Sequence, residues 1–173
     1  MYFEQFNSST YEEALEIWSK EAETCNIFPQ EVVRQLKWIG ESLSTQATVQ
    51  SSSLAYGVFT QKDKSPVAVC ELVISQKGKN NRWMKLLNVT LSPAIEAKVE
   101  AKDLKAIKTA VTAYRTAVAG SFDAKNDHNI DTLKLYGRNK TMLDLLITTY
   151  AALEDSESFE EIKKEGRWLV LRS

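Results

Sequence analysis

The stretch Pro66-Val-Ala-Val-Cys-Glu-Leu-Val-Ile74 decides how the chain folds, because it is rich in β-branched residues and has turn residues on both sides. A second run of this kind, Leu54–Phe59, precedes it across the polar segment Gln61–Ser65. A third run, Trp83–Leu91, follows after a turn that contains Gly78. Three strands joined by short polar turns predict an antiparallel meander.

Helices and further strands are expected on both sides of this meander, from apolar residues at helical spacing or in short β-branched runs. The predicted order is β-α-α-β-β-β-α-β-α-(α)-β, in one mixed α/β domain over residues 1–173, with a mainly antiparallel sheet flanked by helices. The predicted elements outside the meander are a strand at 2–6, a helix at 10–23, a helix from 29 to either Gly40 or the Ser-rich segment after it, a long helix that ends at Gly120, a strand at 130–136, a helix through Leu153, a short helix at 158–165 and a strand at 167–171.

The composition limits the classes of function. The 173 residues include 22 basic and 23 acidic side chains, for a formal charge of −1, which argues against a dedicated nucleic-acid coat. Two cysteines, Cys25 and Cys70, and one histidine, His128, exclude a disulfide framework and multi-histidine metal sites. The first residues lack a signal-peptide pattern and no stretch is apolar enough to span a membrane, so we expect a protein that is neither secreted nor membrane-bound.

This order of elements resembles the GNAT superfamily of N-acetyltransferases over nearly the whole chain. Four stretches carry the resemblance, and they look like the family's second to fifth strands: Tyr56-Gly-Val-Phe59, Pro66–Val73, Leu86-Leu-Asn-Val-Thr-Leu-Ser-Pro93 and Leu135-Tyr-Gly-Arg-Asn139. The resemblance implies a GNAT-like fold, with acetyl-CoA as the cofactor if the chain is active.

The family's cofactor cradle is poorly matched. Its usual pattern is Arg or Gln, two residues, Gly, one residue, then Gly or Ala, where bare backbone meets the pyrophosphate at the opening of the helix after the fourth strand. The matching positions are Glu96, Val99 and Ala101, and only Ala101 fits. Asn139, at the opening of the helix after the fifth strand, also matches a family position. If the chain is active, the resemblance therefore makes Ala101 and Asn139 the cofactor-binding residues.

The acid and base positions also depart from the family. The tyrosine that often serves as general acid is replaced by Leu146, and Tyr150 lies one turn further along. The matching strand offers no glutamate, and Glu71 on the neighbouring strand is the carboxylate placed to serve as base. Glu71 and Tyr150 are thus the catalytic candidates of an active enzyme. Their structural alternatives are a solvated partner of a lysine and a core aromatic.

Two groups of basic residues are candidates for binding an anion or a partner. Lys98, Lys102 and Lys105 have the spacing of one face of the long helix, which acidic neighbours interrupt. Arg138 and Lys140 lie at a helix start, where N–H groups and the helix dipole favour anions. Either group could instead serve as solvated surface or in capping.

Two functions remain open. The first is a non-catalytic GNAT-like module that acts through a protein partner or an oligomer and needs no cofactor. GNAT-like internal virion proteins of bacteriophages are similar in size and layout, which implies a virion-associated alternative to a cytoplasmic location. The second is a divergent acetyl-CoA-dependent N-acetyltransferase. Nucleic-acid binding through the lysine row is a further, less favoured alternative.

Overall fold

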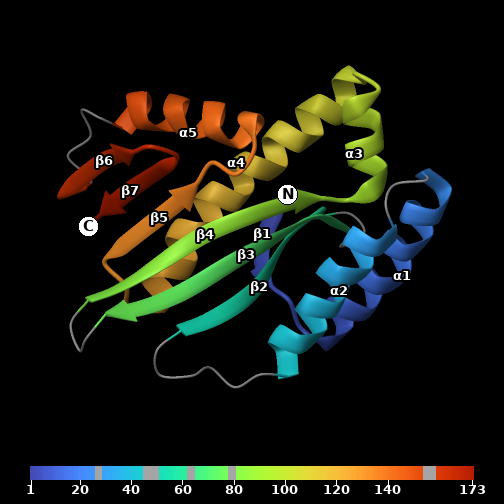
Figure 1. The fold of residues 1–173 in the computed structure, drawn as a ribbon, viewed down its shortest axis with the longest axis horizontal. Helices are drawn as coiled ribbons and strands as arrows, with labels where there is room; N and C mark the ends of the chain where they lie inside the picture. Colours follow the sequence, from blue (N-terminus) through green and yellow to red (C-terminus); the bar gives the residue numbers. More distant parts are fainter. Residues whose placement is uncertain (26–28, 45–50, 62–64, 78–80, 154–158) are drawn as a thin grey trace. The chain divides into compact units, whose positions relative to one another are not determined.

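The computed structural model describes residues 1–25, 29–44, 51–61, 65–77, 81–153 and 159–173. The middle of the predicted turn Gln61–Ser65 and Gly78 of the next predicted turn lie outside these residues. In this part of the chain, five helices flank a seven-stranded, mostly antiparallel sheet with the order β1-β2-β3-β4-β5-β7-β6 (Figure 1). The predicted mixed α/β fold class, with a mainly antiparallel sheet flanked by helices, is therefore confirmed. The elements are β1 (Tyr2–Gln5), α1 (Ser8–Cys25), α2 (Pro29–Ser44), β2 (Ser51–Phe59), β3 (Pro66–Lys77), β4 (Asn81–Leu91), α3 (Pro93–Glu100), α4 (Leu104–Asp127), β5 (Thr132–Tyr136), α5 (Lys140–Leu153), β6 (Glu161–Glu165) and β7 (Trp168–Arg172).

The chain divides into two compact units. The first unit comprises Met1–Gln46, Leu54–Cys70 and Val89–Ala117, and the second comprises Ala47–Ser53, Glu71–Asn88 and Val118–Ser173. Strands β2, β3 and β4 and helix α4 contribute residues to both. The expectation of a single domain over residues 1–173 stays a prediction.

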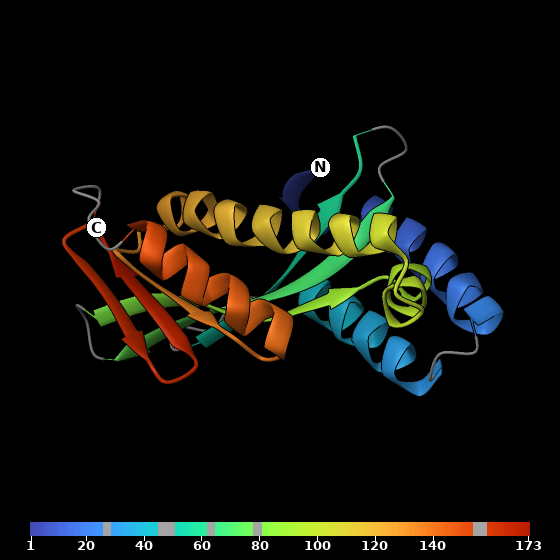
Figure 2. The ribbon, with the colours of Figure 1, turned by 90° about the horizontal axis from the view of Figure 1, so that it is seen from above.

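The core of the first unit forms where α1 and α2 pack together. Figure 2 shows these two helices side by side. Trp18 of α1 is fully buried, and its indole N–H donates to the carbonyl of Pro66 at the start of β3, at 2.9 Å. Gly40 allows the helices to approach, because a Cβ there would lie 2.8 Å from the Tyr11 hydroxyl oxygen. Helix α2 continues through Gly40 to Ser44, so it ends in the Ser-rich segment, the second of its two predicted ends.

Helix α1 begins earlier than the sequence pattern suggested. A reciprocal cap joins Asn7 and Thr10: the Thr10 N–H donates to Oδ1 of Asn7 at 3.0 Å, and the Asn7 N–H donates to Oγ1 of Thr10 at 2.9 Å. The helix expected to begin at residue 10 therefore begins at Ser8, because Thr10 lies inside it and pairs with Asn7 before it.

The long helix predicted after the third strand of the meander is two helices. α3 ends at Glu100 and α4 begins at Leu104, and Lys102 between them has a left-handed φ of 62°. This backbone conformation cannot continue a right-handed helix. At its other end α4 runs through Gly120 to Asp127, past the expected stop.

The second unit contains the larger correction. Residues 158–165 were expected to form a short helix, with one closing strand after them, but Glu161–Glu165 is the strand β6, paired antiparallel with β7. Glu165 pairs with Trp168, so only Gly166 and Arg167 form the turn, and Gly166 has a φ of 60°. Glycine at the first position is typical of a two-residue hairpin turn, which the sequence interpretation overlooked.

Candidate functional site

The helix that follows β4 begins against a carboxylate from another helix. α3 begins at Pro93, and its N-cap Ser92 makes no side-chain cap hydrogen bond. Instead, the Ala94 N–H donates to Oε2 of Glu21 on α1, at 3.2 Å. A helix N-terminus favours anions because of its free N–H groups and its dipole. In this protein a carboxylate of the chain itself takes that position.

The residues of the expected cofactor cradle lie in the body and at the end of α3. The Glu96 N–H donates to the Ser92 carbonyl at 2.9 Å, and the Ala101 N–H donates to the Ala97 carbonyl at 3.0 Å. Both N–H groups are therefore committed to helical hydrogen bonds. Ala101 is the C-cap of α3, so the expectation that it stands at a helix opening is wrong. The cause is Pro93, which begins the helix at once after β4.

Helix α4 also begins at a carboxylate of the chain. Oδ1 of Asp103 accepts hydrogen bonds from the N–H groups of Lys105 and Ala106, at 2.8 and 3.0 Å. The Asp103 carbonyl accepts from the Ile107 N–H at 2.9 Å. The first turn of α4 is thus capped by a negatively charged side chain.

The three lysines of the predicted row do not share one helix. Lys98 lies in the last turn of α3, Lys102 in the connection and Lys105 in the first turn of α4, and all three are exposed. The one-face geometry is wrong because the helix breaks between them. Lys98 also lines a hollow of about 430 Å³ between α1 and α3, together with Cys25 and the carboxylate residue Glu21.

The turn between β5 and α5 is held by an arginine from the β6–β7 hairpin. Arg167 Nε donates to the Gly137 carbonyl at 2.7 Å, and Arg167 Nη2 donates to the Arg138 carbonyl at 2.6 Å. In return, the Gly137 N–H donates to the Arg167 carbonyl at 2.8 Å. A Cβ at Gly137 would lie 2.9 Å from the Leu143 Cα, so this close turn requires glycine. Hydrogen bonds with Arg167 therefore hold the backbone at the predicted anion site in place.

The side chains at this helix start have structural partners. Oδ1 of Asn139 accepts from the Met142 N–H at 2.8 Å, which makes Asn139 the cap of α5. Lys140 Nζ lies 2.8 Å from Oδ2 of Asp144 in an exposed ion pair one turn along. Arg138 is exposed and acts electrostatically on Glu71 of β3. The capping alternative thus accounts for Asn139.

The two catalytic candidates lie in the second unit. Burial raises the pKa of the half-buried Glu71 carboxyl, and the positive charge of Arg138 partly opposes this shift. A raised pKa suits a general base, since it brings the group closer to neutral pH. Tyr150 is half-buried on α5 and has interactions of its own. Leu146, at the family's tyrosine position, is buried in the core.

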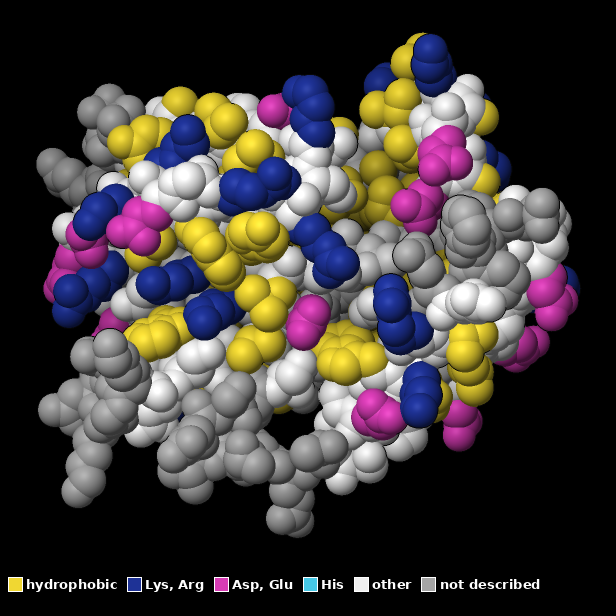
Figure 3. All heavy atoms as spheres, in the orientation of Figure 1, with side chains coloured by type: hydrophobic (Ala, Val, Ile, Leu, Met, Phe, Trp, Pro, Cys, Tyr) yellow, Lys and Arg dark blue, Asp and Glu magenta, His cyan; other side chains and the backbone are white. Residues whose placement is uncertain are grey.

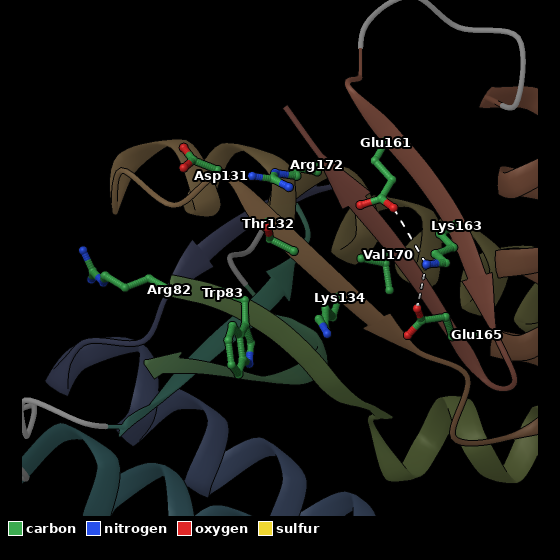
Figure 4. A pocket seen from close by; sticks show the side chains of 10 residues that line it. All are labelled: Arg82, Trp83, Asp131, Thr132, Lys134, Glu161, Lys163, Glu165, Val170 and Arg172. Atoms are coloured by element: carbon green, nitrogen blue, oxygen red, sulfur yellow. Dashed lines mark ion pairs between the residues drawn. The ribbon is translucent and has the colours of Figure 1, made fainter. Parts of the chain in front are cut away.

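A groove that sequence reasoning missed lies on the strands of the second unit. It measures about 260 Å³, and Figure 4 shows it from close by. Trp83 of β4 and Lys134 of β5 line one part of it, and Lys163 of β6 lines another. The parallel ladder that pairs Trp83–Leu86 with Thr132–Leu135 brings these strands together. Nearly 50 residues separate them in sequence, so only the register could have revealed the groove.

The described residues provide neither a metal site nor a membrane-spanning helix. No three His, Cys, Asp or Glu side chains in the described segments come together in a way that could hold a metal ion. No helix in the same segments has the length and apolarity needed to cross a bilayer.

Comparisons with known proteins carry no argument about the function of this chain. No protein-family model matches the sequence, and no curated protein is significantly similar to it. Among solved structures, the chain is similar to an acetyltransferase of the GNAT family from Staphylococcus aureus Mu50, with 15% identity, 98% of this chain and 97% of that chain covered, and a TM-score of 0.39. The functional argument therefore rests on this chain's own residues.

Proposed function

We propose that this chain is a GNAT-like domain that does not use acetyl-CoA and that acts as a structural or protein-interaction module. The proposal rests on one observation, that carboxylates of the chain itself cap both helices after β4. Glu21 accepts from the first turn of α3, and Asp103 accepts from two N–H groups of α4. A pyrophosphate would have to displace these carboxylates and lie beside their negative charge.

A partner-binding role also fits the exposed apolar side chains of the first unit. Val33 of α2 is 60% exposed and Leu104 of α4 is 74% exposed. Scattered apolar residues are normal on a surface, so these two support the proposal only together with the capped helices. The similarity in size and layout to internal virion proteins of bacteriophages extends the proposal to a place in a phage particle. Co-purification of the chain with intact particles would test that extension.

The alternative is a divergent N-acetyltransferase, in which Glu71 would be the base and Tyr150 the acid. The raised pKa of Glu71 is the observation that favours it. Isothermal titration of the protein with acetyl-CoA separates the two functions. The proposal predicts no saturable heat, whereas binding at micromolar affinity would overturn it. Loss of such binding in Ala101→Glu, with binding kept in the surface control Lys37→Gln, would place the cofactor beside α3.

A further inference from the structure

One face of the strands in the second unit is covered, and the other is open. Along β4 and β5 the residues of one face are fully buried, while the alternate residues keep part of their surface exposed. Figure 3 shows Lys and Arg side chains among hydrophobic ones over β4, β5 and β7. The buried set is Met84, Leu86, Leu133 and Leu135, and the open set is Trp83, Lys85, Thr132 and Lys134.

Two lysines crowd the same indole ring on this open face. Nζ of Lys85 lies 5.6 Å from the centroid of the Trp83 ring, and Nζ of Lys134 lies 5.3 Å from it. Lys85 and Lys134 are also direct register partners on neighbouring strands. Each ammonium gains from the ring, but the two positive charges repel each other. An anion placed between them would relieve that repulsion.

The indole N–H of Trp83 provides an independent observation. Its Nε1 atom is buried and has no hydrogen-bond acceptor among the described residues. A buried polar group of this kind is rare and calls for an explanation. The lysine side chains lie against the ring, so an oxyanion that draws their ammonium groups toward itself would uncover the N–H. That group would then donate to the same oxyanion.

The opposite side of the groove limits what the ligand can be. Lys163 on β6 lies between two carboxylates, 3.8 Å from Oε1 of Glu161 and 3.5 Å from Oε1 of Glu165 (Figure 4). Its charge is thus already neutralised, and Arg172, the register partner of Glu161, also lines the groove, so this side carries two carboxylates and two cations. A polyanion such as a nucleic acid would meet these carboxylates, whereas a small ligand with one anionic group would not.

We propose that the Trp83 groove binds a small ligand through a single oxyanion group, either a phosphate or a carboxylate. Nζ of Lys85 and Nζ of Lys134 hold the oxyanion, and the Trp83 N–H donates to it. The cavity of about 260 Å³ admits a ligand of only modest size. This site is separate from the helix starts after β4, and it is independent of whether the chain binds acetyl-CoA.

Tryptophan emission and calorimetry test the site with two probes, inorganic phosphate and glutarate, at constant ionic strength. We expect at least one probe to change the emission saturably at millimolar concentration or below, and the responding probe identifies the oxyanion. Lys85→Gln/Lys134→Gln should weaken that binding at least about tenfold. The matched control Lys37→Gln/Lys108→Gln removes the same charge from two exposed residues of the first unit and should bind like the original protein.

Three outcomes would overturn the proposal. The first is no saturable response to either probe, and the second is equal weakening in the two double variants. The third is an emission change that persists in Trp83→Phe, since the signal would then come from another tryptophan. A single-stranded dT oligomer that binds more tightly than both probes would show a nucleic-acid surface instead. Circular dichroism of each variant establishes that it is folded.

Discussion

Replacing Asp103 with alanine removes the cap of α4 and should destabilise the protein measurably. In the structure, one carboxylate oxygen of Asp103 accepts from two backbone N–H groups, those of Lys105 and Ala106, at 2.8 and 3.0 Å. Alanine offers no acceptor, so both donors would be left to solvent. The connection before α4 carries the left-handed Lys102, and two backbone hydrogen bonds hold it, from the Lys102 N–H to the Val99 carbonyl and from the Asp103 N–H to the Lys98 carbonyl, both at 2.9 Å.

The expected loss is about 1 kcal/mol of unfolding free energy, the usual cost of replacing an aspartate cap with alanine. For a chain of this length, that corresponds to a fall in the thermal midpoint of about 2–4 °C. Urea denaturation followed by circular dichroism measures the free energy, and a thermal scan measures the midpoint.

Asp103→Asn is the matched control, because its side-chain oxygen can still accept the two hydrogen bonds. It should lose no more than the charge–dipole contribution, a few tenths of a kcal/mol up to about 1 kcal/mol. The reasoning is refuted if Asp103→Ala is as stable as the original protein. It is also refuted if the asparagine variant is destabilised more than the alanine variant.

Three other predictions follow from contacts elsewhere in the molecule. Trp18→Phe leaves the buried Pro66 carbonyl without its donor and should cost about 2 kcal/mol in urea denaturation; a loss below about 0.5 kcal/mol would show that the bond contributes nothing. Arg167→Lys loses the two-pronged contact with the turn at Gly137, so the first turn of α5 should exchange its amide hydrogens faster, and unchanged exchange would contradict the role of the arginine. Because burial raises the pKa of Glu71 in the folded protein, its contribution to stability is lost as pH rises from below the ordinary glutamate pKa through the folded one. Glu71→Gln should therefore gain stability relative to the original protein between acidic and neutral pH in urea titrations, and parallel pH profiles would refute this.

The strands of the meander and the overall class could be predicted because their signals are local. Two stretches are dense in β-branched and apolar residues, Pro66–Ile74 and Trp83–Leu91. The first lies in β3 and the second in β4. β6 was missed because Glu161–Glu165 has only one apolar residue, and its pairing with β7 comes from the neighbouring strand and the turn at Gly166. An edge strand needs few apolar residues, so its composition resembles that of a polar helix.

The sequence alone shows that the cofactor cradle is poorly matched. It does not show which side chains cap the helices after β4 or that a groove lies at Trp83. The sequence lacks glycine where a cofactor cradle would need it, and that absence is visible at Val99. The capping by Glu21 is a long-range contact, because 73 positions separate it from Ala94. The Trp83 groove depends on the register between β4 and β5, which no local pattern encodes. Contacts of this kind require the tertiary structure.

The central claim is that the N–H groups at the helix starts after β4 are already used by the chain's own carboxylates. The most direct test is to follow the backbone amide resonances of Ala94, Lys105 and Ala106 by nuclear magnetic resonance while acetyl-CoA is added. We predict that all three stay unchanged up to millimolar acetyl-CoA. A saturable shift of these amides, together with slower hydrogen exchange, would contradict the claim.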